Sequence, residues 1–90
     1  MPLNAYVLIH VSGPQTMSVL RKIQKFKGVM SAHVVVGPYD VIAFVEGDNH
    51  KEIGDLVFTK IRRVQGVTAT TTCLQWKFKF PPSFYSLLFF

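Results

Sequence analysis

The feature that most restricts the fold of this chain is a short break, Gly37-Pro38-Tyr39-Asp40, between two apolar runs at 34–36 and 41–45. Glycine tolerates a positive φ and proline presets φ, so this pair favours a tight turn between two strands. The sequence therefore predicts a hairpin. The turn itself needs neither Tyr39 nor Asp40. These two residues either cap the turn or, with its exposed N–H groups, bind a small zwitterion.

Hydrophobic periodicity places this hairpin within a larger repeat of strands and helices. Each predicted helix ends at a glycine followed by a valine, at Gly28 and at Gly66. The predicted elements are a strand at 5–12, a helix at 15–26, strands at 29–36 and 41–46, a helix at 50–64 and a strand at 67–74. This β-α-β-β-α-β order predicts a ferredoxin-like α+β domain, in which two helices cover one face of an antiparallel four-stranded sheet.

The uncovered face of that sheet is expected to be a subunit interface. In the first strand it carries Tyr6, Leu8 and His10, which are too apolar as a group to remain in water. Hydrophobic residues make up 49% of the chain and charged residues only 17%, which is more apolar surface than one small core hides. The sequence therefore predicts an oligomer, with a dimeric α+β-barrel-like assembly as its basic unit.

The last part of the chain, 77–90, differs in composition from the domain predicted at 1–76. It is rich in aromatic residues, and Pro81-Pro82 prevents a continuous helix or strand across it. Two interpretations remain open: an arm that docks on a neighbouring subunit, or a poorly ordered terminus.

Charge and cysteine content limit the possible functions. The net charge of +5 invites a nucleic-acid interpretation, but most of the basic residues fall at the ends of the two predicted helices, where cations offset the helix dipole. Cys73 is the only cysteine, which excludes an internal disulfide, and its place in a strand predicts a buried thiol. No signal peptide and no membrane-spanning run is recognised, so we expect a cytoplasmic protein without a membrane partner.

No constellation of catalytic or metal-binding residues stands out. The three histidines are far apart, no Cys-x-x-Cys is present, and the carboxylates form no obvious acid/base pair. We therefore expect a protein that is not an enzyme and that needs no metal or other cofactor.

Five short motifs, in their order and spacing, resemble the ligand-binding (RAM) domain of the leucine-responsive regulator (Lrp/AsnC) family over residues 4 to about 76. The motifs are Ala5-Tyr6-Val7-Leu8-Ile9, Gly28-Val29, Gly37-Pro38-Tyr39-Asp40, Gln65-Gly66-Val67 and Thr70-Thr71-Thr72. The resemblance implies dimers that pair through their sheets and often form rings, commonly octamers. It also implies that an amino acid or related effector binds at subunit interfaces near the hairpin.

Carried over to this sequence, the resemblance makes Gly37, Tyr39 and Asp40 the effector loop, with Thr70 and Thr72 nearby. Full members also have an amino-terminal helix-turn-helix, for which no room precedes Ala5. We therefore expect no direct operator binding, but a stand-alone module that senses an effector or joins full-length Lrp/AsnC-type regulators.

This leading interpretation, an amino-acid-responsive regulatory module, has three alternatives. One is a purely structural assembly domain without a ligand, the second is a small dimeric ferredoxin-like enzyme, and the third is a nucleic-acid binder.

Overall fold

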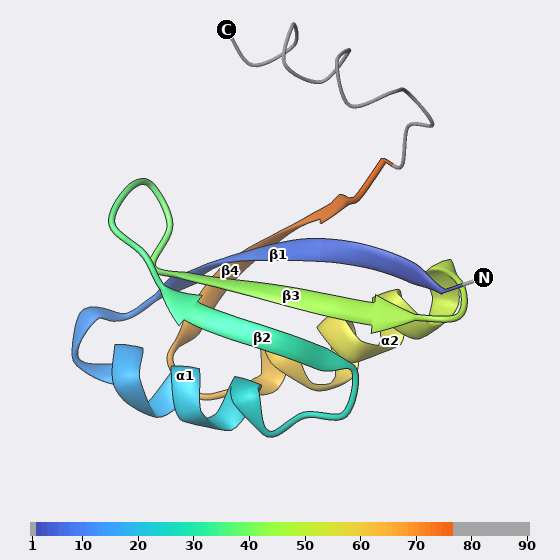
Figure 1. Cartoon of the computed structure of the whole chain (residues 1–90). Coiled ribbons are helices and arrows are strands. Elements are labelled where there is room, and N and C mark those ends of the chain that lie inside the picture. Colours follow the sequence, from blue (N-terminus) through green and yellow to red (C-terminus); the bar gives the residue numbers. More distant parts are fainter. Residues whose placement is uncertain (1, 77–90) are drawn as a thin grey trace, which may run out of the picture.

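A computed structural model describes residues 2–76 and confirms the ferredoxin-like fold (Figure 1). The four strands form one antiparallel sheet in the order β2-β3-β1-β4. In chain order the elements are β1 (Leu3–Val11), the 3-10 turn η1 (Gly13–Gln15), α1 (Thr16–Gln24), β2 (Val29–Val34), β3 (Val41–Gly47), α2 (His50–Thr59), the 3-10 turn η2 (Ile61–Arg63) and β4 (Val67–Leu74).

Both helices of residues 2–76 lie on one side of the sheet, and no other element of these residues covers the second side, the open face (Figure 1). In β1 the residues that face the helices alternate with those on the open side, and Ala5, Val7 and Ile9 have no exposed surface. The predicted helical stripes meet these strand residues. The buried core residues contributed by the helices and the segment that follows α2 are Val19, Ile23, Ile53, Leu56, Val57, Ile61 and Val64.

The second helix is shorter than the predicted 50–64. α2 ends at Thr59, because Lys60 leaves helical geometry with φ −124° and ψ −61°, and the chain continues as η2. The predicted stripe is buried nevertheless, since a 3-10 turn repeats every three residues and keeps Ile61 and Val64 on the same side.

The two glycines at the helix-to-strand steps have conformations that other residues rarely adopt. Gly28 has φ +96° and Gly66 has φ +106°. At Gly66 the restriction is also steric, because a Cβ placed there would lie 2.6 Å from the Cβ of Gln15. The Ser12 N–H donates to the Gly66 carbonyl at 2.8 Å, so this glycine holds the start of the helix layer close to β4.

β4 is the less covered edge strand of the sheet, and most of its side chains are exposed. The predicted burial of Cys73 is therefore wrong: the thiol is exposed, because within residues 2–76 no strand lies beyond β4 and no helix covers the face on which Cys73 lies. None of the helices in residues 2–76 is long and apolar enough to span a membrane. The two interpretations of the 77–90 segment concern residues outside the described part of the chain.

Candidate functional site

The hairpin between β2 and β3 forms where the sequence predicts it, although the second strand ends at Val34 rather than at position 36. The Val35 N–H donates to the Asp40 carbonyl at 2.9 Å and closes a four-residue loop. Gly37 within the loop has φ +152°. In Figure 1 this loop rises above the sheet on the open side, away from the helices.

Tyr39 connects the loop to the open face of the sheet. Its ring stacks on His10 of β1, with the two ring centroids 4.4 Å apart. Its hydroxyl donates to Thr71 Oγ1 of β4 at 3.3 Å. The loop is therefore fixed over two neighbouring strands, and the polar groups of three elements lie together.

Asp40 anchors the loop through its carboxylate. β1 extends beyond its last pair with β3, Ile9 with Val41, and there the Val11 N–H donates to Asp40 Oδ2 at 2.8 Å. The Asp40 N–H in turn donates to the Ile9 carbonyl at 3.0 Å. Within residues 2–76 the bond from Val11 is the only hydrogen bond to the carboxylate, so Oδ1 can bind another group. The carboxylate thus has a structural role, whatever else it binds.

Thr70 and Thr72 do not lie near Tyr39 in the same chain. They pair with Ile9 and Val7, which face the helices, so both threonines are on the helix side of β4. There they line a groove of about 570 Å³ between β4 and α2. The single chain brings the hairpin together with Thr71 instead.

Sequence reasoning missed Thr71 and placed His10 only at an interface. The signal for Thr71 is the two-residue period of the strand: Thr71 lies opposite Leu8, on the face shared by Tyr6, Leu8 and His10. That signal becomes usable only when the register between β1 and β4 is known.

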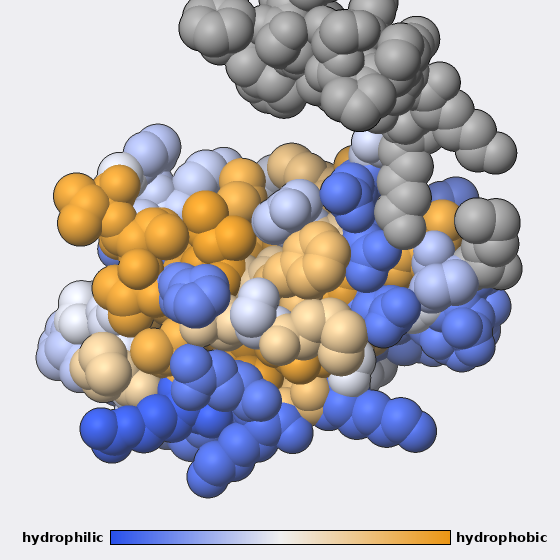
Figure 2. Space-filling model, viewed as in Figure 1, coloured by the Kyte–Doolittle hydropathy of each residue, from blue (hydrophilic) through white to orange (hydrophobic). Residues whose placement is uncertain are grey.

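The open face next to the loop is apolar. Tyr6 is 42% exposed, and its ring lies 5.0 Å from that of Phe44 on β3. Leu8 and Ile42 lie opposite each other and are half-buried. Figure 2 shows that hydrophobic surface gathers over the strands and the hairpin, whereas hydrophilic surface gathers over the helices.

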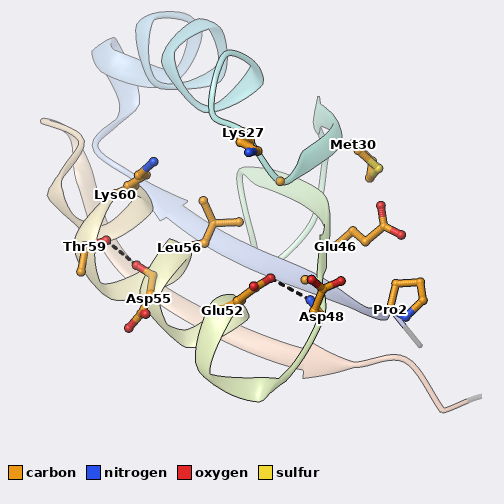
Figure 3. Close-up of a pocket in the computed structure, with 12 residues that line it drawn as sticks. Pro2, Lys27, Met30, Glu46, Asp48, Glu52, Asp55, Leu56, Thr59 and Lys60 are labelled. Atoms are coloured by element: carbon orange, nitrogen blue, oxygen red, sulfur yellow. Dashed lines mark hydrogen bonds between the residues drawn. The ribbon is translucent and has the colours of Figure 1, made fainter.

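A second hollow, of about 720 Å³, lies at the opposite end of β3 (Figure 3). One of its carboxylates, that of Glu52, serves the start of α2: the Asp48 N–H donates to Glu52 Oε2 at 2.8 Å, and the Glu52 N–H donates to Asn49 Oδ1 at 2.9 Å. This is a variant of the capping box in which Glu52 bonds the N–H of the residue before the N-cap residue Asn49. No group of three or more His, Cys, Asp or Glu side chains in the described residues is arranged to hold a metal.

With this geometry established, comparison with known proteins is decisive about the family. The chain belongs to the Lrp/AsnC ligand binding domain family, whose model matches residues 4–77. An uncharacterized HTH-type transcriptional regulator from Pyrococcus furiosus is 35% identical over 76 residues, which cover 81% of this chain and 51% of that protein. The chain thus spans about half the length of the curated relatives it matches.

Solved structures agree with this assignment. The protein TTHA0845 from Thermus thermophilus superimposes with a TM-score of 0.81 at 30% identity, over 88% of this chain and 98% of that one. The transcriptional regulator NMB0573 from Neisseria meningitidis, in complex with L-Met, has a TM-score of 0.70 at 14% identity, over 88% of this chain and 53% of that one. The second likeness concerns the fold alone.

Proposed function

We propose that this protein is a regulatory module that binds an amino acid or a related small effector at a subunit interface beside the loop 37–40. The family supports a regulatory, ligand-binding role without catalysis. The observation that carries the proposal is the packing of Tyr39 on His10 and Thr71, which places the loop at the border of the apolar open face. A pairing of two sheets would then enclose the loop and exclude water from it.

The chemistry of the loop suits a zwitterion. Asp40 Oδ1 is available to an α-ammonium group, while threonine hydroxyls and loop N–H groups suit an α-carboxylate. Enclosure at an interface lowers the local dielectric constant and strengthens both contacts. The L-Met bound to NMB0573 supports an amino acid as the class of effector.

A second subunit completes the site in this proposal. Gly37, Tyr39 and Asp40 extend from the open face, whereas Thr70 and Thr72 lie on the helix side of β4. One effector contacts both sets only if the loop of one subunit meets the groove of another. Pairing through the open faces would not bring these two sets together, so the contact between loop and groove would form between dimers in a higher ring.

Full-length regulators are the proposed protein partners. This chain spans about half of its HTH-type relatives, and shared sheet interfaces would allow mixed assemblies. The exposed free thiol of Cys73 suits a reducing, cytoplasmic setting. No cofactor is part of the proposal.

The hydrogen bond from Val11 to Asp40 favours one alternative, a structural assembly domain without a ligand. In that case Asp40 serves only to fix the loop. The two functions differ in whether the negative charge of Asp40 matters or only its ability to accept a hydrogen bond.

Asp40→Asn separates these functions, because asparagine retains an oxygen for the Val11 N–H and loses the charge. We expect one of the twenty amino acids to raise the melting temperature of the wild-type chain, since a ligand at 100 times its Kd stabilises by about 2.7 kcal/mol. Calorimetry should then show at least a ~10-fold loss of affinity in Asp40→Asn. Asp48→Asn, an exposed control outside the loop, should bind normally. The structural alternative holds if no amino acid changes the melting temperature or the mass measured by light scattering.

A further inference from the structure

The cations of the described chain are gathered on one part of the helix layer. Eight of the ten lysines and arginines lie in residues 2–76, and all eight are exposed. Lys51 forms the one ion pair recorded within these residues, with Asp55 at 2.8 Å. The other seven lie in the second half of α1, shortly after α1, or shortly after α2. They are Arg21, Lys22, Lys25, Lys27, Lys60, Arg62 and Arg63.

The carboxylates lie elsewhere. Four of the five acidic residues of the chain, Glu46, Asp48, Glu52 and Asp55, line the hollow at the start of α2 (Figure 3). Two of these side chains already have partners: Glu52 accepts a hydrogen bond at the start of α2, and Asp55 pairs with Lys51. Lys27 and Lys60 border this hollow, but the remaining cations have no carboxylate partner within residues 2–76.

The fold brings the ends of both helices to a single groove of about 520 Å³. Lys22 of α1 lies on one wall, and Lys60 and Arg63 lie on the other. The half-buried Phe26 and the buried Val64 form apolar parts of the lining. Cations on both walls of one groove repel each other, and an anion bound between them relieves that repulsion.

Helix dipoles account for only part of this arrangement. A cation in the last turn stabilises a helix, but the effect falls off within that turn. The last turn of α1 contains Arg21 and Lys22. Lys25 and Lys60 directly follow α1 and α2, so the dipoles explain these four cations. Arg63 adds charge beyond this need, and so does Arg62, which also lies over the Phe58 ring at 5.0 Å from its centroid. Sequence alone assigned most of the basic residues to solvated helix ends, because it does not show that the two ends meet.

We propose that this groove and the cations around it bind the phosphate backbone of duplex DNA without reading its sequence. Because the cations are spread over two helix ends, they match a row of phosphate groups better than a single phosphate ion. The groove carries cations on both walls, with Thr59 and Gln65 as its other polar side chains, and this arrangement fits backbone phosphates, which position a duplex without specifying its sequence. The open face and the effector loop lie on the other side of the sheet, so a dimer formed there leaves the groove accessible. The proposal does not depend on an effector.

The test is fluorescence anisotropy of the full chain with a duplex of roughly 20 base pairs over a salt series. We expect log K to fall linearly with log salt, with a slope of about −0.9 for each phosphate neutralised. The Lys22→Glu/Arg63→Glu chain should lose at least ~10-fold in affinity and show a shallower slope. Lys51→Glu is the control, because it changes the charge by the same amount but lies outside the groove. Lys22→Glu alone and Arg63→Glu alone should each weaken DNA binding more than Lys51→Glu does.

Three outcomes would overturn the proposal. One is the absence of binding at low salt. Another is an equal loss in Lys51→Glu and Arg63→Glu, which would mean that only net charge matters. The last is displacement of the duplex by poly-glutamate at an equal concentration of charge, which would indicate an acidic protein partner. Circular dichroism shows whether each variant is folded. If the glutamate variants do not fold, the double variant Lys22→Gln/Arg63→Gln takes their place.

Discussion

The two faces of the sheet are built from the same strands but are completed in different ways. On the helix side, Val7, Ile9 and Val45 have no exposed surface. On the open side, Tyr6 is 42% exposed, and Leu8 is only half-buried although it lies between two of those core residues. Within residues 2–76, the helices cover one face, whereas no element covers the other.

This difference separates stability from assembly. Substitutions on the covered face should change the free energy of unfolding of the single chain. Substitutions on the open face should change how chains associate, and those in the loop should change the polar contacts at the border between the two.

Ile9→Ala tests the covered face and should have the largest effect. Ile9 has no exposed surface, and its truncation removes buried methyl groups and leaves a cavity. We expect the free energy of unfolding, measured by urea denaturation, to fall by about 2–5 kcal/mol. A loss below about 1 kcal/mol would show that this face is less tightly packed than the structure indicates.

Gly66→Ala tests how the helix layer is held against β4. Alanine is strained at φ +106°, and its Cβ would lie 2.6 Å from the Cβ of Gln15. A loss of about 1–3 kcal/mol is expected in the same measurement. Gly54→Ala is the matched control, since a Cβ there meets nothing within 4 Å and a glycine inside a helix costs about 0.5–1 kcal/mol. The control should therefore be stabilised, and a stabilised Gly66→Ala would contradict the assigned packing.

The alternation of residues on the covered face explains why sequence predicts the fold well. β1 alternates from Ala5 to Val11, the helical stripes pack against the core, and Gly28 and Gly66 mark the ends of the helical segments. Each of these signals is local in the sequence. Even where α2 stops early, Ile61 and Val64 remain buried, because burial is fixed by the apolar stripe and not by the type of helix.

The site is less predictable because it depends on register. The difference between Thr70 and Thr71 is one position in β4, and that step moves a side chain to the other face of the sheet. The Val11 N–H, which lies beyond the last pair of β1 with β3 and is satisfied by Asp40, also has no sequence signal of its own. The exposure of Cys73 follows from the place of β4 at the edge, which the element order alone does not give.

Leu8→Asp tests the open face. A carboxylate at the centre of an apolar interface loses its hydration without gaining a partner, so self-association should weaken by at least ~10-fold while the fold persists. Sedimentation velocity measures the association and circular dichroism the fold. Met17→Asp introduces the same charge on the helix side, at a residue that is 52% exposed, and should not change association. Equal sedimentation of wild type and Leu8→Asp would mean that the open face is not the interface.

The smallest effect is expected at the border, where Tyr39 donates to Thr71. Tyr39→Phe keeps the ring that stacks on His10 and removes only the hydroxyl. Because the hydrogen bond is exposed, its loss should cost no more than about 0.5–1.5 kcal/mol. A double-mutant cycle with Thr71→Val isolates the bond, since its coupling energy excludes the effect of each substitution alone. A coupling near zero would mean that the bond does not hold the loop in solution, and the stacked ring would then be the contact that positions it. If effector binding is lost in Tyr39→Phe although the coupling is small, the hydroxyl contacts the effector and not Thr71 when the site is occupied.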